Sequence, residues 1–391
     1  MHIGFDISQT GADKAGCGYF AHAMIEAMLE LAPEHRYSLF PSFGDFYFDA
    51  RMPLRSPYQG KDVRSGPRHF SLEAARTFWN SDDLQSALDR PDVVHANNFW
   101  CPLQLTTSRL IYTLYDLGFA ENPSWTTESN RVGCFEGVFR SAMVADWVAA
   151  ISESSRSHYL RSFPHFPEDR IRVIHPCSRF TDSTAVGHRP KSLDSLTPGT
   201  FWLTVGTIEP RKNQRRLVEA YARYLKLGGV PMPLVLAGGK GWLMDDFERY
   251  IDDWKLQGRA IMIGYVTDDE LIWLYRNCYA NLYPSLFEGF GLPVLEGMQF
   301  GAPTVASDST SIPEVTGDAA ILISPKDVDG WTQSMLRLAS DTEQRNRLGT
   351  LACARAAQFA RKRSAAAILE LYQEAMALPK RHSQQAIALQ Y

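Results

Sequence analysis

The 391-residue chain lacks three features that would place it in a special class of protein. No apolar run approaches the ~20 residues that a membrane-spanning helix needs. Basic residues are not in excess, because 40 Lys and Arg stand against 44 Asp and Glu, and the net charge of −4 argues against a dedicated nucleic-acid binder. No basic region precedes the first apolar segment, HIGFDIS, so we expect no signal peptide and a cytoplasmic location.

Cysteine is also scarce, and its distribution excludes two kinds of scaffold. The six cysteines are scattered and form no Cys-x-x-Cys pair, which predicts free thiols in a reducing compartment rather than a disulfide framework or a zinc site. The G-x-G-x-x-G fingerprint of dinucleotide-binding domains is absent as well. What remains is an ordinary globular composition, 45% hydrophobic and 21% charged, with length for about two to three domains.

Strand-like apolar runs alternate with amphipathic helical segments along the chain, which predicts an α/β protein with parallel sheets covered on both faces. The polar segment 181–198 lacks an apolar period and is interpreted as a linker between domains 1–180 and 199–363. Segment 44–67, rich in Pro, Arg and aromatic residues, is interpreted as a long loop. We expect strands at residues 2–8, 37–40, 92–97, 110–116, 145–151 and 170–175, and then at 201–205, 234–237, 260–263, 280–284, 303–306 and 321–323.

The most informative stretch is 280–301, ANLYPSLFEGFGLPVLEGMQFG. Its pattern predicts a buried strand, a loop with Gly289 and Gly291, and a helix with Pro293 in its first turn, where no amide hydrogen is needed. The amino end of a helix gathers free N–H groups and the positive pole of the helix dipole. This stretch therefore predicts a binding site for an anionic group.

Two carboxylates, Glu288 and Glu296, flank this loop with seven residues between them. Glu296 lies three residues after Pro293, so it can face the same ligand as the loop. Two glutamates at this spacing are common by themselves, and the alternative is a crossover loop with two solvated side chains. The sequences PSLFEGFGLPVLE and GAPTVASDSTSIPEV around them make the pattern far more specific.

This stretch resembles the EX7E motif of the retaining glycosyltransferases of family 4. The resemblance covers nearly the whole chain and is strongest over residues 204–325. It implies the GT-B fold, in which two Rossmann-like domains face each other across a cleft. The first would bind the acceptor and the second the nucleotide-sugar donor, and a final helix within 364–391 would cross back to the first domain. The implied reaction is a metal-independent, retaining sugar transfer to an acceptor hydroxyl.

The resemblance also assigns residues to the donor. Lys212 matches the family's diphosphate lysine, Arg211 stands beside it, and Thr207 occupies a place where relatives often carry arginine. Cations at a helix start oppose its dipole unless an anion compensates, which supports a phosphate nearby. Glu296 matches the ribose-binding carboxylate, and Glu288 lies by the donor sugar. The remaining donor-binding positions are Gly16, Gly18, Tyr265, Val266, Gly289, Phe290, Gly291 and Leu292.

In the first domain Asp116 is the best candidate for orienting the sugar or the acceptor, and it joins Glu288, Lys212 and Arg211 in the catalytic set. Tyr115 stands where the family usually has histidine, so either its phenol takes over the sugar contact or the ring only packs. His95 is a candidate acceptor contact, although a lone histidine is more often structural.

A triplet that resembles a metal-binding D-x-D motif occurs at Asp327 and Asp329. Because it follows a strand and precedes a helix, we interpret it as a turn and helix cap, and expect no metal and no cofactor.

The segments GTIEPRKN and PSLFEGFGLPVLEGM look like those of mannosyltransferases that build bacterial surface polysaccharides. We therefore expect GDP-mannose as donor, with a UDP-sugar as the alternative. The expected acceptor is a glycan or a lipid-linked glycan, reached by peripheral contact with the cytoplasmic face of the inner membrane. A nucleotide-sugar epimerase or a non-catalytic sugar-binding protein on the same fold remains a further alternative.

Overall fold

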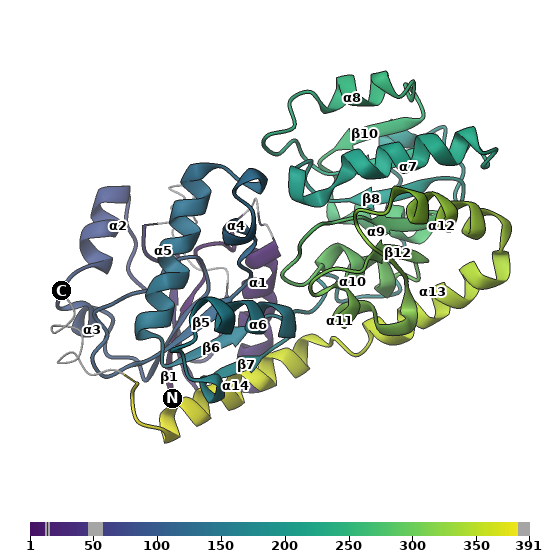
Figure 1. Cartoon of the computed structure of the whole chain (residues 1–391). Helices are drawn as coiled ribbons and strands as arrows, with labels where there is room; N and C mark the ends of the chain where they lie inside the picture. Colours follow the sequence, from purple (N-terminus) through teal and green to yellow (C-terminus); the bar gives the residue numbers. More distant parts are fainter. Residues whose placement is uncertain (12–13, 15, 46–57, 382–391) are drawn as a thin grey trace. The chain divides into compact units, whose positions relative to one another are not determined.

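The computed structural model describes residues 1–11, 14, 16–45 and 58–381, and the chain divides into two compact units (Figure 1). The first unit comprises Met1–Glu121, Glu128–Arg179 and Ala360–Tyr391, and the second comprises Asn122–Thr127 and Phe180–Phe359. Each unit contains one parallel sheet, so the predicted α/β class with two Rossmann-like parallel-sheet domains is confirmed.

Among the described residues the first unit has a seven-stranded sheet in the order β3-β2-β1-β4-β5-β6-β7. The predicted strands are present, and β3 is an additional edge strand inside segment 44–67, which was interpreted as a loop. The rest of that interpretation, at residues 46–57, lies outside the described residues. The strands are β1 (His2–Asp6), β2 (Arg36–Phe40), β3 (Val63–Ser65), β4 (Val93–Ala96), β5 (Arg109–Leu114), β6 (Trp147–Ala150) and β7 (Ile171–Val173).

Helices cover the first sheet, and the last helix of the chain belongs to this unit. Helix α14 (Arg361–Ala377) packs along α1 (Gly16–Leu31), where Arg361 pairs with Glu26 at 2.9 Å and Glu30 at 2.8 Å (Figure 1). The predicted segment beyond residue 381 lies outside the described residues. The other helices are α2 (Leu72–Trp79), α3 (Leu84–Ala87), α4 (Gly118–Glu121), α5 (Glu128–Val144), α6 (Glu153–Ser162) and η2 (Glu168–Arg170).

The second unit has a six-stranded sheet among the described residues, in the order β10-β9-β8-β11-β12-β13. Neighbouring side chains on β8 enter different cores, because Trp202 packs on one face and Leu203 on the other. This alternation shows that both faces of the sheet are covered. The strands are β8 (Trp202–Val205), β9 (Leu234–Ala237), β10 (Ala260–Gly264), β11 (Ala280–Tyr283), β12 (Thr304–Ser307) and β13 (Ile321–Ile323).

The helices of the second unit include α8, which the sequence did not predict. Within the described residues, the structure has no helix with the length and apolarity needed to cross a membrane. The helices are η1 (Pro123–Trp125), η3 (Lys191–Leu193), η4 (Pro210–Lys212), α7 (Gln214–Lys226), α8 (Phe247–Asp253), α9 (Asp268–Asn277), α10 (Leu292–Gln299), α11 (Ile312–Thr316), η5 (Gly317–Ala319), α12 (Val328–Ser340) and α13 (Thr342–Ala356).

Segment 181–198, interpreted as a linker, packs on the second unit. Arg276 of α9 donates hydrogen bonds to the carbonyl oxygens of Ser183 and Ala185, and Leu193 is buried among the residues of one core cluster. The polar composition of the segment concealed this anchoring, because the bonds use its backbone carbonyls rather than its side chains.

Candidate functional site

Two loops of the second unit meet because their strands are neighbours. β8 and β11 are adjacent and parallel, with Trp202 opposite Ala280, so the loops that follow them leave the same edge of the sheet. Asn213, in the left-handed conformation (φ 60°), donates its amide to the carbonyls of Pro284 (2.9 Å) and Pro325 (2.8 Å). These bonds join segment 206–213 to segment 284–291.

Glu288 is the centre of this site, and its carboxylate is almost fully buried at 7% exposure. Oε1 accepts hydrogen bonds from the Lys212 ammonium (2.6 Å), the Tyr283 hydroxyl (2.9 Å) and the Ser285 hydroxyl. Oε2 accepts a bond from the Arg211 guanidinium at 3.0 Å. The structure thus brings together the predicted Glu288, Lys212 and Arg211.

Neighbouring charges, rather than burial, decide the protonation state of Glu288. Burial alone raises its pKa, but Lys212 and Arg211 outweigh this effect and lower the pKa to about 2. Glu288 is therefore ionised at neutral pH and does not serve there as a proton donor.

The loop after Glu288 is held in one conformation. Its backbone N–H donates to Thr310 Oγ1 (2.9 Å), and its carbonyl accepts from Ser311 Oγ (2.9 Å). Gly291 has φ 103°, and a Cβ there would lie 2.5 Å from Ile312 Cδ1, so no other residue fits without strain. Helix α10 begins at Leu292, directly after this glycine, so its amino end and the positive pole of its dipole follow the Glu288 loop.

Two further donor candidates lie in this loop and on α10. The Phe290 ring is buried and contacts the ring of Phe359 edge-on, with centroids 5.6 Å apart. A ligand at this loop would therefore contact the backbone of Phe290 rather than its ring. Glu296 is on the buried side of α10, where Tyr275 donates its hydroxyl to Oε2 at 3.3 Å.

The remaining candidates of the second unit follow β8 and β10. Thr207 comes directly after Gly206, and a Cβ on Gly206 would lie 3.7 Å from the Lys212 side chain. Tyr265 is 73% exposed at the end of β10, and Val266 packs partly against the core. Since β10, β9 and β8 are consecutive in the sheet, Tyr265 and Thr207 lie at the same edge.

In the first unit, two predicted residues follow β5. The Tyr115 hydroxyl is directed at the carbonyl oxygens of Cys17 (3.2 Å) and Asn97 (3.1 Å), and the ring is buried. Asp116 Oδ1 accepts a bond from Gly118 N (2.8 Å) at the start of α4. The Tyr115 hydroxyl therefore forms its hydrogen bonds within the first unit, whereas the half-buried Asp116 lies at the surface of that unit.

His95 is fully buried, and both ring nitrogens are engaged. Nδ1 is 2.6 Å from the Tyr372 hydroxyl and Nε2 is 2.7 Å from Thr113 Oγ1. Burial lowers the pKa of His95 to about 3, so the ring is neutral. This geometry ties β4 and β5 to α14 and gives no support to an acceptor contact by His95.

The glycine loop of the first unit is described in part. Gly16 begins α1, and a Cβ on Gly18 would lie 2.1 Å from the Gln9 carbonyl oxygen, so close packing requires glycine there. Residues 12, 13 and 15 of the predicted ligand-binding loop lie outside the described residues.

Four polar side chains at these sheet edges escaped the sequence analysis. Tyr283 and Ser285 both donate to Glu288. Glu209, 2% exposed, accepts a bond from Arg211 at 2.8 Å. Asn97 is 1% exposed, and neither atom of its amide has a partner within the described part of the chain. Two of them left a signal: Glu209 lies inside GTIEPRKN beside two cations, and Asn97 ends the buried strand 92–97.

The D-x-D-like triplet is a helix cap, as predicted. Asp327 accepts a bond from Gly330 N (2.9 Å) at the start of α12, and Asp329 pairs with Arg223 at 2.6 Å. Among the described residues, no cluster of three or more His, Cys, Asp or Glu side chains is arranged to hold a metal ion.

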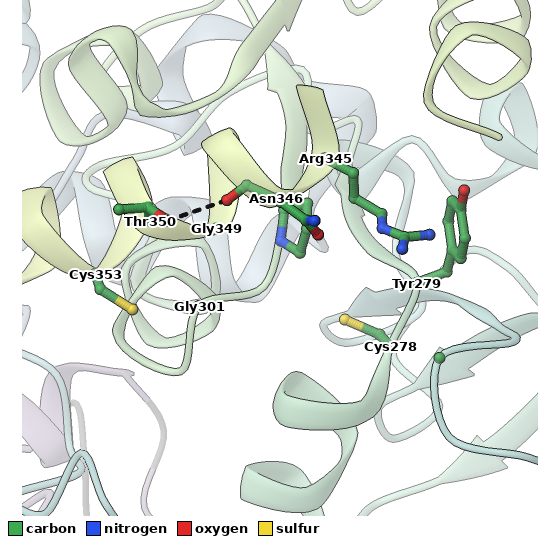
Figure 2. Close-up of a pocket in the computed structure, with 10 residues that line it drawn as sticks. Cys278, Tyr279, Gly301, Arg345, Asn346, Gly349, Thr350 and Cys353 are labelled. Carbon is green, nitrogen blue, oxygen red and sulfur yellow. Dashed lines mark hydrogen bonds between the residues drawn. The ribbon is translucent and has the colours of Figure 1, made fainter. Parts of the chain in front are cut away.

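A separate hollow of about 460 Å³ lies at the opposite edge of the second sheet (Figure 2). Gly199, Tyr279 and Pro303, which precede β8, β11 and β12, line it together with residues of α13. The Arg345 guanidinium lies over the Tyr279 ring, 4.3 Å from its centroid (Figure 2). None of the predicted site residues lines this hollow.

Comparison with known proteins agrees with this geometry. Residues 190–354 match the family described as glycosyl transferases group 1. The chain is 31% identical over 299 residues to O-antigen chain mannosyltransferase B of Escherichia coli, covering 74% of this chain and 76% of that protein. It is 28% identical over 403 residues to the serotype-specific mannosyltransferase WbdA of E. coli, covering 92% of this chain but 46% of WbdA. The chain thus spans about half the length of WbdA.

The fold has solved relatives as well. The crystal structure of Anabaena HepE in complex with UDP and glucose superposes with a TM-score of 0.68, at 17% identity, over 96% of this chain and 100% of that one.

Proposed function

The chain belongs to the group 1 glycosyltransferases and has their GT-B fold, and we propose that it is a metal-independent, retaining mannosyltransferase. Its donor is GDP-mannose, and its acceptor is a hydroxyl of a glycan or lipid-linked glycan in surface polysaccharide synthesis. The O-antigen mannosyltransferase relatives support mannose. The observation that carries the proposal is the buried, ionised Glu288 held against Lys212 at the amino end of α10.

The leaving diphosphate is stabilised by fixed positive groups. As the bond between the sugar C1 and the phosphate oxygen breaks, negative charge grows on the diphosphate. Lys212 and the positive pole of the α10 dipole stabilise this charge. These groups are held in place before the donor arrives, so little reorganisation is needed during the reaction.

Glu288 acts as a fixed negative charge. The sugar becomes oxocarbenium-like in the transition state, and a carboxylate whose pKa is about 2 can stabilise that positive charge throughout the neutral pH range. A carboxylate with so low a pKa is a weak base and does not take the acceptor's proton. That proton passes instead to the leaving phosphate oxygen while the acceptor oxygen bonds to C1 on the same face and the bond from C1 to the phosphate oxygen breaks. This step conserves the configuration at C1.

The nucleoside is held by residues further along the same edge. The Glu296 carboxylate is a pure acceptor and can take both ribose hydroxyls. The exposed Tyr265 and the adjacent Val266 receive the base, and Thr207 and the amides of the glycine loop complete the donor site.

The first unit orients the acceptor through Asp116 at the end of β5. We propose that the enzyme works in the cytoplasm, at the inner membrane face, where a lipid-linked glycan would be presented.

Calorimetric titration in EDTA tests the donor. GDP and GDP-mannose, then UDP, UDP-glucose and UDP-N-acetylglucosamine, are titrated into the wild type, Glu296→Ala and the exposed control Glu248→Ala. We expect GDP ligands to bind without metal, Glu296→Ala to abolish this binding, and the control to retain it.

Each other result has a defined meaning. Preferential binding of UDP ligands would replace GDP-mannose with a UDP-sugar. Binding of no nucleotide, or only with a divalent metal, would refute the proposal. Conversion of the donor without incorporation into any acceptor would favour an epimerase.

A further inference from the structure

We infer that Arg211 is a positioning residue that holds Glu288 in place, that Glu209 is the second carboxylate anchoring it, and that Lys212 is the side-chain cation for the diphosphate. This inference rests on the proposed function, because it divides the roles of two neighbouring cations at the same site.

The Arg211 guanidinium bridges the two loops of the site. One terminal nitrogen donates to the Phe287 carbonyl (2.8 Å) and to Glu288 Oε2 (3.0 Å), while the other donates to Glu209 Oε1 (2.8 Å). The planar, forked guanidinium suits such a bridge, which a lysine ammonium cannot reproduce. Arg211 therefore sets the distance between segments 206–213 and 284–291.

Glu209 explains why Arg211 stays there. Its carboxylate is buried, and a buried charge is costly without a partner of opposite sign. If Arg211 swung toward a phosphate, it would leave Glu209 and one oxygen of Glu288 without this cation. Glu209 directly precedes the short helix η4, which contains Arg211, and so its position is set by the same turn.

Lys212 is bound differently. Its ammonium carries three N–H groups and contacts two acceptors in the described structure, the Tyr283 hydroxyl (2.9 Å) and Glu288 Oε1 (2.6 Å). One donor thus remains for a phosphate oxygen. Its side chain also runs beside Gly206, where the missing Cβ leaves the backbone open.

The charges of the cluster lead to the same division of roles. Two carboxylates, Glu209 and Glu288, balance two cations, Arg211 and Lys212. These four side chains together therefore carry no net positive charge that would attract a diphosphate by itself. Binding depends on the N–H groups of Lys212 and on the dipole of α10, and catalysis depends on where Arg211 holds Glu288.

The test compares Glu209→Gln, Arg211→Lys and Lys212→Ala. We expect the first two to lower kcat about ten- to a hundredfold through misplacement of Glu288, with the Kd for GDP changed less than twofold. Lys212→Ala should weaken GDP binding at least tenfold. The double variant Glu209→Gln/Arg211→Lys should lose no more activity than Arg211→Lys alone, because both changes break one bridge.

Arg223→Lys is the matched control, because Arg223 also bridges two carboxylates, Glu219 and Asp329, but at the surface of the same unit. It should leave kcat and the Kd for GDP unchanged. A rise in the Kd for GDP on Arg211→Lys as large as that on Lys212→Ala, with kcat at saturating donor unchanged, would overturn the inference.

A second readout needs no activity and separates this inference from the proposed function. The protonation of Glu288 can be followed in the nucleotide-free protein by ¹³C-carboxyl labelling of glutamate, with Glu288→Gln to assign the signal. Arg211→Ala should raise the pKa of Glu288, because it removes one of the two cations that lower it. Glu209→Gln removes a negative charge from the far side of Arg211, so it should lower this pKa further and shift the Glu288 signal. An unchanged Glu288 signal in both variants would refute the bridge, even if the wild type proved inactive with every donor.

Discussion

Each sheet carries a buried carboxylate at the carboxyl edge of its strands, and the pKa values of the two are shifted in opposite directions. Asp6, at the end of β1, accepts N–H groups from Ser8 (2.8 Å) and Asn97 (3.1 Å), and burial raises its pKa to about 7. Glu288 is equally buried, but Lys212 and Arg211 lower its pKa to about 2. The comparison shows that neighbouring cations, and not the degree of burial, determine which carboxylate carries a charge.

The two edges accordingly suit different ligands. The edge of the second unit holds fixed charges of both signs and the amino end of α10, as a nucleotide diphosphate requires. The described part of the first edge has the unpaired amide of Asn97 and the high-pKa Asp6, which suit uncharged hydroxyl groups. We propose on this basis that the donor binds at the edge of the second unit.

Replacing Asp6 should produce the largest effect. The native carboxyl stays protonated up to about pH 7, whereas in the unfolded chain it ionises near 3.8, so wild-type stability falls as pH rises between these values. Asp6→Asn lacks this dependence, and its stability relative to wild type should improve by about 4 kcal/mol from pH 3 to pH 8. Urea unfolding measures this change. Exposed Asp82→Asn is the control. Parallel pH profiles would show that Asp6 is charged.

Removing Lys212 should impair catalysis at the edge of the second sheet. Lys212→Ala loses a fixed cation facing the leaving group and should lower kcat about 10²- to 10³-fold, equivalent to about 2–4 kcal/mol of transition-state stabilisation. Steady-state transfer assays measure it, with the exposed Lys226→Ala as control. A loss below threefold would mean that the amides of α10 suffice for the diphosphate.

Glu288→Gln tests the opposite sign of pH dependence. Ionised Glu288 stabilises the native state above the unfolded pKa of about 4.5, and this contribution disappears as pH falls toward 2. The variant should therefore be about 3 kcal/mol less stable than wild type at pH 6, and the gap should close toward pH 2. Urea unfolding across this range measures the gap, and a constant difference would contradict the pairing with Lys212 and Arg211.

Tyr115→Phe should have the smallest effect. It removes the hydroxyl that contacts the carbonyls of Cys17 and Asn97 and should cost about 1 kcal/mol of stability. Because the hydroxyl is used inside the first unit, the Kd of the donor should not change. A weaker donor affinity with unchanged stability would instead show that the phenol contacts the donor sugar.

Short-range patterns in the sequence were enough for much of the architecture. The strand, glycine loop and helix at 280–301 formed as predicted because Gly291 and Pro293 act through local backbone conformation. Thr267 and Glu270 likewise form a capping box at the start of α9, which is another local device because the two residues are three positions apart. Strand β3 escaped notice because three residues at a sheet edge show no periodicity.

The chemistry of the site depended on contacts between distant residues. Glu209 and Tyr283 meet Arg211 and Glu288 only because β8 and β11 are neighbours in the sheet. His95 looked like a ligand at the end of a strand, but α14, from the other end of the chain, covers it.

The sequence by itself determined the family, the alternation of strands and helices, and the position of the helix amino end that predicts an anion site. These follow from residue spacing and local backbone preference, which act over a few positions. Only the tertiary structure decided that the pKa of Glu288 is lowered and that of Asp6 raised, and that Arg211 is bound between two carboxylates. The reason is physical: a pKa depends on burial and on charges within a few ångströms, and elements far apart in the chain supply both.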